Sequence, residues 1–93
     1  MKLTERKKQI ERHADILAKS RDRWIKKNNY FYNDDCSYMR FLVGEKARVL
    51  DLGCGTGYLL NSLNPSYGVG VDLSANMVSI AQQNYPNLEF IQG

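Results

Sequence analysis

The sequence has no apolar run that approaches the roughly 18 residues needed for a membrane-spanning helix. Its first residues are charged and polar and lack the apolar stretch of a signal peptide, which favours a cytoplasmic location. There are only two cysteines and one histidine, with no CxxC pair, so neither a metal site nor a disulfide is expected. The 93 residues suffice for one small domain.

Basic residues are scarce in most of the chain. Ten of the thirteen Lys and Arg residues lie within residues 1–27, together with only four acidic residues. After Arg48 there is no Lys or Arg at all. We therefore expect two parts of different character, an N-terminal helical lid or extension over residues 1–46 and a second part over residues 47–93.

The N-terminal part predicts two helices. Residues 3–27 contain no Gly or Pro, and a narrow apolar stripe at helical spacing should pack on the rest of the chain: Ile10, Ala14, Leu17 and Trp24. The Asn- and Asp-rich stretch 27–35 predicts a break, because these residues favour turns. A short helix over 37–43, capped by Asp34 or Asp35, should follow.

From Ala47 onward, short apolar runs alternate with helical segments. Strands are predicted over residues 47–52, 69–73 and 88–92, with helices over 56–63 and 74–84 between them. Ser74 is the expected N-cap of the second of these helices. The β-α-β-α-β order predicts an α/β fold: N-terminal helices followed by a partial doubly wound (Rossmann-like) three-stranded parallel sheet.

Glycines crowd the junction between the first strand and the helix that follows it. Gly53, Gly55 and Gly57 permit positive φ and remove side chains, so that a ligand can approach the backbone. Asp72 ends the second strand, 21 residues after Asp51, where an acid can accept hydrogen bonds from ribose hydroxyls. The two features together predict a nucleoside-binding site at the carboxyl ends of the strands.

The spacing of the loop bears on which nucleoside is bound. Gly53 and Gly55 fit the first two positions of the dinucleotide fingerprint GxGxxG, but Tyr58 stands where the third glycine belongs. The segments "VLDLGCGTG", "GVGVDLS" and "ANMVSIAQQN" instead resemble the class I S-adenosylmethionine-dependent methyltransferases of the small-molecule type. The resemblance covers residues 47–93.

That resemblance implies roles for the residues of the glycine loop. Backbone groups around Gly53, Cys54 and Gly55 would approach the methionine part and the ribose of S-adenosylmethionine, and Gly57 would complete the loop. Asp51 would orient the amino group of the methionine part. The residues themselves favour Cys54 as a small loop filler and not as a nucleophile.

The resemblance also assigns the second strand and the helix after it. Asp72 would hold the ribose hydroxyls, while Leu73 and Met77 would pack on the adenine. Met77 is equally well explained as a core residue of its helix, and the two roles are compatible. Residues 1–93 offer no identifiable catalytic acid or base.

The leading hypothesis is the cofactor-binding N-terminal part of a methyltransferase whose acceptor is a small molecule, such as a lipid or sugar precursor. The alternatives are a non-catalytic nucleotide-binding or interaction module and, third, an NAD-binding domain. Because the family normally has more strands than three, we expect a fragment of a longer enzyme that is inactive alone. The first strand would then leave an open sheet edge through which a homodimer can form.

The N-terminal part has two interpretations. It can act as a lid that closes over the cofactor, with the aromatic residues 30–32 reaching the pocket or simply packing. It can also act as a basic helix that binds nucleic acid or an anionic membrane. The interspersed acids and the narrow apolar stripe disfavour the second interpretation, although the excess positive charge can still steer an anionic substrate.

Overall fold

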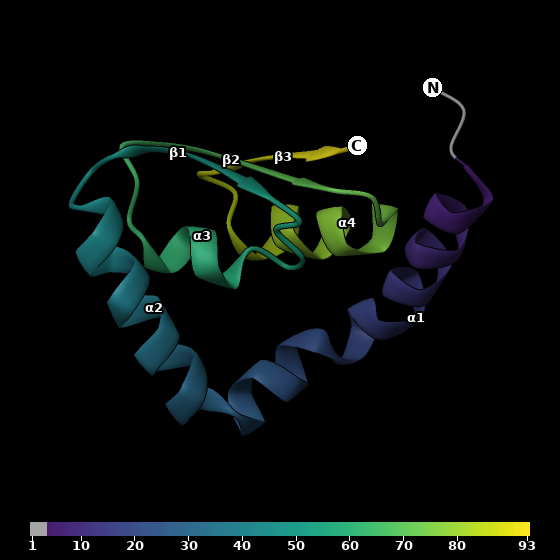
Figure 1. Cartoon of the computed structure of the whole chain (residues 1–93), viewed down its shortest axis with the longest axis horizontal. Helices are drawn as coiled ribbons and strands as arrows, with labels where there is room; N and C mark the ends of the chain where they lie inside the picture. The colour runs from purple at the N-terminus through teal and green to yellow at the C-terminus, as the bar shows by residue number, and fades with distance from the viewer. Residues whose placement is uncertain (1–3) are drawn as a thin grey trace.

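The computed structural model of the chain describes residues 4–93, without the side chains of residues 31 and 32. Two helices precede three strands that alternate with two further helices (Figure 1). The elements are α1 (Glu5–Lys27), α2 (Asn29–Val43), β1 (Arg48–Leu52), α3 (Tyr58–Ser62), β2 (Tyr67–Asp72), α4 (Ala75–Asn84) and β3 (Glu89–Gln92). Every strand and helix predicted for residues 47–93 is present, and Ser74 caps α4 as predicted.

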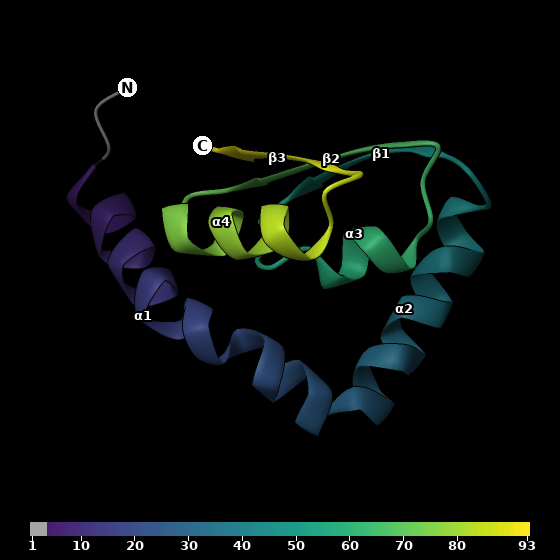
Figure 2. The ribbon, with the colours of Figure 1, turned by 180° about the vertical axis from the view of Figure 1, so that it is seen from behind.

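The three strands form one parallel sheet in the order β1-β2-β3. This arrangement confirms the predicted α/β fold and leaves β1 at an edge of the sheet. Helices α3 and α4 lie against one face of the sheet, and α1 and α2 form a V beyond them (Figures 1 and 2). No described element covers the other face, where Leu50, Leu52 and Ile91 are exposed.

The core lies between the sheet and its helices. Its buried members are Cys54 from the glycine loop, Leu60 from α3, Ala81 from α4 and Phe90 from β3. Gly70 in β2 makes this packing possible, because a Cβ atom there would lie 2.8 Å from both Cys54 Sγ and Phe90 Cδ1. The absence of a side chain in β2 therefore lets the glycine loop and β3 approach each other.

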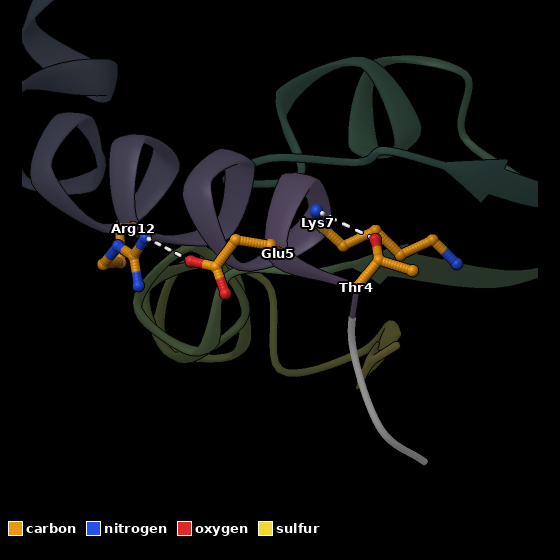
Figure 3. Close-up of polar contacts among 4 residues, drawn as sticks. All are labelled: Thr4, Glu5, Lys7 and Arg12. Atoms are coloured by element: carbon orange, nitrogen blue, oxygen red, sulfur yellow. Dashed lines mark hydrogen bonds and ion pairs between the residues drawn. The ribbon is translucent and has the colours of Figure 1, made fainter.

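The first helix starts with a side-chain cap, which Figure 3 shows. The Lys7 N–H donates to Thr4 Oγ1 at 3.3 Å, so that one of the free N–H groups of the first turn is satisfied. Glu5 and Arg12 form an ion pair at 3.6 Å, but both side chains are largely exposed and the pair adds little stability. The start predicted at residue 3 lies outside the described residues.

A break does occur within the predicted range 27–35, but it is confined to Asn28, because α2 begins at Asn29. Only Asn28 separates the helices: its backbone N–H and its side-chain amide both donate to Trp24 O, at 3.0 and 2.9 Å, and thereby end α1. Asp34 and Asp35 lie inside α2 and cap nothing. Intrinsic preference is a weak guide when tertiary packing stabilises a helix, and here Cys36 anchors α2 in the interior.

The face of α1 that packs on the rest of the chain also differs from the prediction. Ala18 and Ile25 are the buried residues of α1, whereas Ile10, Leu17 and Trp24 remain about half exposed. Carboxylates beside the buried face make the contacts with α4 and β3. The physical reason is that hydrogen bonds of polar side chains share this face with Ala18 and Ile25, so hydrophobicity alone does not reveal it in the sequence.

No helix within residues 4–93 is both long enough and apolar enough to cross a membrane. Among these residues no cluster of three or more His, Cys, Asp or Glu side chains is arranged to hold a metal ion. Both cysteines are free thiols and are buried.

Gly70→Ala tests the close packing at β2. We expect a loss of about 1–3 kcal/mol in the free energy of unfolding, because the added methyl group forces Cys54 and Phe90 to shift. Urea denaturation measures this loss. Gly93→Ala is the control, since its added Cβ would lie 3.4 Å from Val71 Cγ1 in ordinary contact. Equal stability of the two variants would contradict the role of Gly70.

Candidate functional site

The glycine loop between β1 and α3 contains two kinds of glycine. Gly53, Gly55 and Gly57 all have positive φ, at 78°, 56° and 87°. A Cβ atom at Gly53 or Gly55 would meet nothing within 4 Å, whereas one at Gly57 would lie 2.8 Å from Phe90 Cζ. The first two glycines therefore leave the backbone open to a ligand, and Gly57 serves the packing of α3.

The loop is tied to the end of β2 by backbone hydrogen bonds. The N–H groups of Gly53 and Cys54 both donate to Val71 O, at 2.7 and 3.0 Å. This shared acceptor holds the loop against the carboxyl end of the neighbouring strand. In α/β sheets ligands bind at that end, so the loop stands where a ligand is expected.

Asp72 joins the same loop from the other strand. Its Oδ2 accepts from Gly55 N at 2.9 Å, and its Oδ1 accepts from Ser74 N at 2.9 Å. A carboxylate has about four acceptor positions, so capacity remains for the hydroxyl groups of a ligand. The predicted ribose anchor is thus also the group that fixes the loops after β1 and β2 to each other.

A cavity of about 580 Å³ opens at this point and falls in the size range of small-molecule sites. One wall belongs to the α/β part and consists of Gly53, Gly55, Asp72 and Met77. The opposite wall belongs to one face of α1 and consists of Arg6, Gln9, Ile10, His13, Ala14, Leu17 and Arg21. Three residues of the apolar stripe that was predicted to pack on the rest of the chain, Ile10, Ala14 and Leu17, therefore line this cavity.

A larger cavity of about 680 Å³ lies elsewhere. It is lined by the residues that lead into β2 and β3, including Tyr67, Gly68 and Glu89 at the amino ends of these strands. No glycine of the loop and no predicted site residue borders it. We therefore assign the candidate site to the smaller cavity at the carboxyl ends.

Asp51 and Asp72 place negative charge on the strand side of the site. Burial, and next the charge of Asp72, raise the pKa of Asp51 above its usual value. Burial, followed by the charges of Asp72 and Asp51, raises the pKa of Cys54 to about 12. The Cys54 thiol is therefore protonated at neutral pH, which agrees with a packing role and not with a nucleophile.

The remaining predicted residues divide between cavity and support. Met77 is buried and also lines the cavity, so both of its proposed roles are compatible with its position. Leu73 is half-buried, and its carbonyl accepts from Gln92 Nε2 at 3.1 Å. Cys54, Gly57, Asp51 and Leu73 are not among the lining residues.

The interpretation of the N-terminal part as a lid placed α1 near the cofactor, but none of the α1 residues that line the cavity was predicted as a site residue. The signal of this wall in the sequence is the helical spacing of Arg6, Ile10, His13, Leu17 and Arg21, but nothing in the pattern says what this face meets. His13, which looks like a surface residue, is exposed and borders the cavity. Of the aromatic residues 30–32, Tyr30 is exposed and outside the cavity, and the other two side chains lie outside the described residues.

Comparison with known proteins identifies the family of the α/β part. The family model of a methyltransferase domain matches residues 49–93. A demethylmenaquinone methyltransferase from Chlorobaculum tepidum is 37% identical over 70 residues, which cover 61% of this chain and 29% of the relative. A malonyl-[acyl-carrier protein] O-methyltransferase from Halalkalibacterium halodurans is 41% identical over 56 residues, which cover 53% of this chain and 21% of the relative.

A solved structure adds the cofactor. CalS10, an amino pentose methyltransferase from Micromonospora echinaspora with bound S-adenosylmethionine, is 28% identical with a TM-score of 0.52. The match covers 66% of this chain and 27% of that protein. These findings confirm the predicted resemblance: residues 49–93 are a methyltransferase-domain segment of the class I, S-adenosylmethionine-dependent type. The chain spans 29% and 21% of the two curated relatives.

Asp51→Asn tests the electrostatics of the site. The pKa of Asp51 is raised in the folded state, so its ionised form destabilises the fold at neutral pH and its protonated form does not. We expect Asp51→Asn to increase the free energy of unfolding at pH 7. The increase should shrink as the pH falls through the raised pKa of Asp51.

Urea denaturation between pH 7 and pH 3 measures this effect. Asp35→Asn, at an exposed position of α2, is the control and should show no comparable increase. A stability gain that is the same at both ends of the pH range would mean that the charge of Asp51 is not its cause.

Proposed function

We propose that this chain provides the S-adenosylmethionine-binding part of a methyltransferase that acts on a small-molecule acceptor. The observation that carries the proposal is the cavity where the open glycines Gly53 and Gly55 meet Asp72. The backbone of these glycines and the remaining acceptor positions of Asp72 suit a nucleoside with two ribose hydroxyls. When bound, the cofactor supplies an activated methyl group, and the protein supplies its position.

The charges of the site favour this cofactor over NAD. Asp51 and Asp72 lie on neighbouring strands, so the strand side of the site carries two carboxylates that suit a cationic group. S-adenosylmethionine carries a sulfonium and an ammonium group, whereas NAD would bring a pyrophosphate to the same loop. Tyr58 adds a second argument, since it stands where the dinucleotide fingerprint requires a glycine for close packing of helix on strand. Its hydroxyl instead donates to Asn33 Oδ1 of α2 at 3.0 Å.

The nature of the acceptor is suggested by the relatives. Those named above are a demethylmenaquinone methyltransferase, a malonyl-[acyl-carrier protein] O-methyltransferase and an amino pentose methyltransferase. They support an acceptor of the lipid- or sugar-precursor kind, and the interspersed charges of α1 do not favour nucleic acid. We further propose a cytoplasmic location, and that the 93-residue chain binds the cofactor without turnover, since it spans less than a third of the two curated relatives.

Calorimetry on the 93-residue chain tests the proposed cofactor. We expect S-adenosylmethionine and S-adenosylhomocysteine to bind and NAD not to bind. Asp72→Ala should weaken S-adenosylhomocysteine by about 1–3 kcal/mol, because hydrogen bonds to a charged acceptor are lost.

Asp35→Ala is the matched control for this experiment and should keep the affinity of the wild-type chain. Binding of NAD alone would overturn the proposal in favour of a dinucleotide-binding domain. Failure of all three ligands to bind would favour a non-catalytic interaction module.

We also propose that the chain forms a homodimer through the open edge at β1. Backbone groups along an unpaired edge can bind a strand of a second copy, and the exposed apolar surface beside this edge favours association. Leu50 and Leu52 on β1 are 62% and 73% exposed, which is unusual for leucines of a parallel strand.

Sedimentation equilibrium over a range of concentrations tests the homodimer. We expect dimers at high concentration, and Leu52→Lys should shift the equilibrium toward monomers. Asn61→Lys, at an exposed position of α3 away from this edge, is the control. Monomers alone at high concentration would overturn the proposal.

A further inference from the structure

Ser74 lies between two carboxylates that come from different parts of the chain. It is fully buried. Its N–H donates to Asp72 Oδ1 at 2.9 Å, and its hydroxyl donates to Asp15 Oδ1. The same hydroxyl accepts from Met77 N at 3.1 Å, as the N-cap of α4. The Ser74 hydroxyl thus both donates and accepts a hydrogen bond, which fixes its position.

Asp15 belongs to α1 and is attached to α4 by more than this one bond. Its Oδ1 also faces Asn76 N at 3.4 Å, and its backbone carbonyl accepts from Asn76 Nδ2 at 3.3 Å. A carboxylate at this place also meets the positive end of the α4 dipole. Asp15 is therefore the point at which α1 is fastened to the N-terminus of α4.

The residues on either side of this attachment form the wall of the candidate cofactor site. Ala14 precedes Asp15, and His13 and Leu17 lie within one turn of it; all three line the cavity. The opposite wall contains Asp72, which Ser74 holds. A continuous series of hydrogen bonds thus runs from Gly55 through Asp72 and Ser74 to Asp15.

We propose that Asp15 is a positioning residue of the cofactor site: through Ser74 it couples the docking of α1 to the occupation of Asp72 by a nucleoside. The inference rests on the proposed function, because it takes the nucleoside site at Asp72 as given. By linkage, a ligand that orders Asp72 also stabilises the docked position of α1, and a docked α1 raises the affinity for the ligand by the same factor.

A second attachment of α1 to α4 provides a matched control. Asn84 Nδ2 donates to Asp22 Oδ2 at 2.7 Å. Asp22 is also a carboxylate of α1 that binds α4, but it borders a different hollow together with Ile25, Tyr58 and Tyr85. It has no hydrogen bond to Ser74 or Asp72. Substitution of Asp22 therefore removes a hydrogen bond between α1 and α4 but leaves the hydrogen bonds from Asp15 through Ser74 and Asp72 to Gly55 intact.

The first experiment compares the affinity of Asp15→Ala and Asp22→Ala for S-adenosylhomocysteine by calorimetry. We expect Asp15→Ala to weaken binding about tenfold, as the loss of a hydrogen bond to a charged group does, and Asp22→Ala to change it less than twofold. Asp15→Asn keeps one acceptor oxygen for the Ser74 hydroxyl and should recover part of the affinity. It also serves as the test variant if Asp15→Ala does not fold.

The second experiment separates positioning from general stability. Hydrogen exchange of residues 5–27 is measured with and without saturating S-adenosylhomocysteine. In the wild-type chain and in Asp22→Ala the ligand should slow exchange in α1, whereas in the Asp15 variants it should not. Equal slowing in all variants, or wild-type affinity in the Asp15 variants, would overturn the inference while leaving the proposed function intact.

The coupling of α1 to Asp72 can also be tested without a ligand, by hydrogen exchange and by unfolding. This test is needed if the wild-type chain binds neither S-adenosylmethionine nor S-adenosylhomocysteine. That result would overturn the proposed function. Asp72→Asn should nonetheless accelerate exchange in α1, and the effects of Asp72→Asn and Asp15→Asn on stability should not be additive, since the two side chains share Ser74. Additive effects with unchanged exchange in α1 would overturn the coupling itself.

Discussion

The carboxylate of Asp72 is the interaction on which the candidate site depends. It ends β2 and accepts one backbone N–H from the glycine loop and another from the start of α4, both at 2.9 Å. Without an acceptor at this place, the N–H groups of Gly55 and Ser74 would lose their hydrogen-bond partner, and the two loops that form the site would be destabilised. One side chain therefore both shapes the loop and offers its remaining acceptor positions to a ligand.

The glycines work with Asp72 by leaving space on both sides of the loop. On the ligand side, Gly53 and Gly55 have positive φ and no neighbour where a Cβ would stand, so the backbone is accessible. On the core side, Gly70 leaves room for Cys54, whose thiol fills the gap between loop and sheet. This division explains why Cys54 is buried and protonated in the middle of a loop that looks reactive in the sequence.

The α/β part could be predicted from the sequence because its signals are local. Each strand is a short apolar run bounded by Gly, Pro or Asn, and the cap at Ser74 stands directly before its helix. The attachment of α1 could not be predicted, since it joins Asp15 to Ser74 across 59 residues, and the helical spacing of its polar side chains does not tell which residues they contact. The start of α2 was missed for a related reason: Asn and Asp favour turns in isolation, but a helix held by Cys36 in the interior overrides that preference.

The concentration of basic residues in the N-terminal part matters for the site, because α1 faces the cavity. The basic N-terminal part brings Arg6 and Arg21 to one wall, and Asp72 stands on the other with Asp51 on the neighbouring strand. Such a site suits a zwitterionic ligand, whose cationic groups lie near the carboxylates and whose anionic group lies near α1. A pyrophosphate pressed on the loop would instead meet the Asp72 carboxylate, and α3, with only five residues, has a weak dipole to offset it. The uneven charge of the sequence thus places a basic helix across the cavity from an acidic strand end, and this arrangement suits a zwitterionic cofactor.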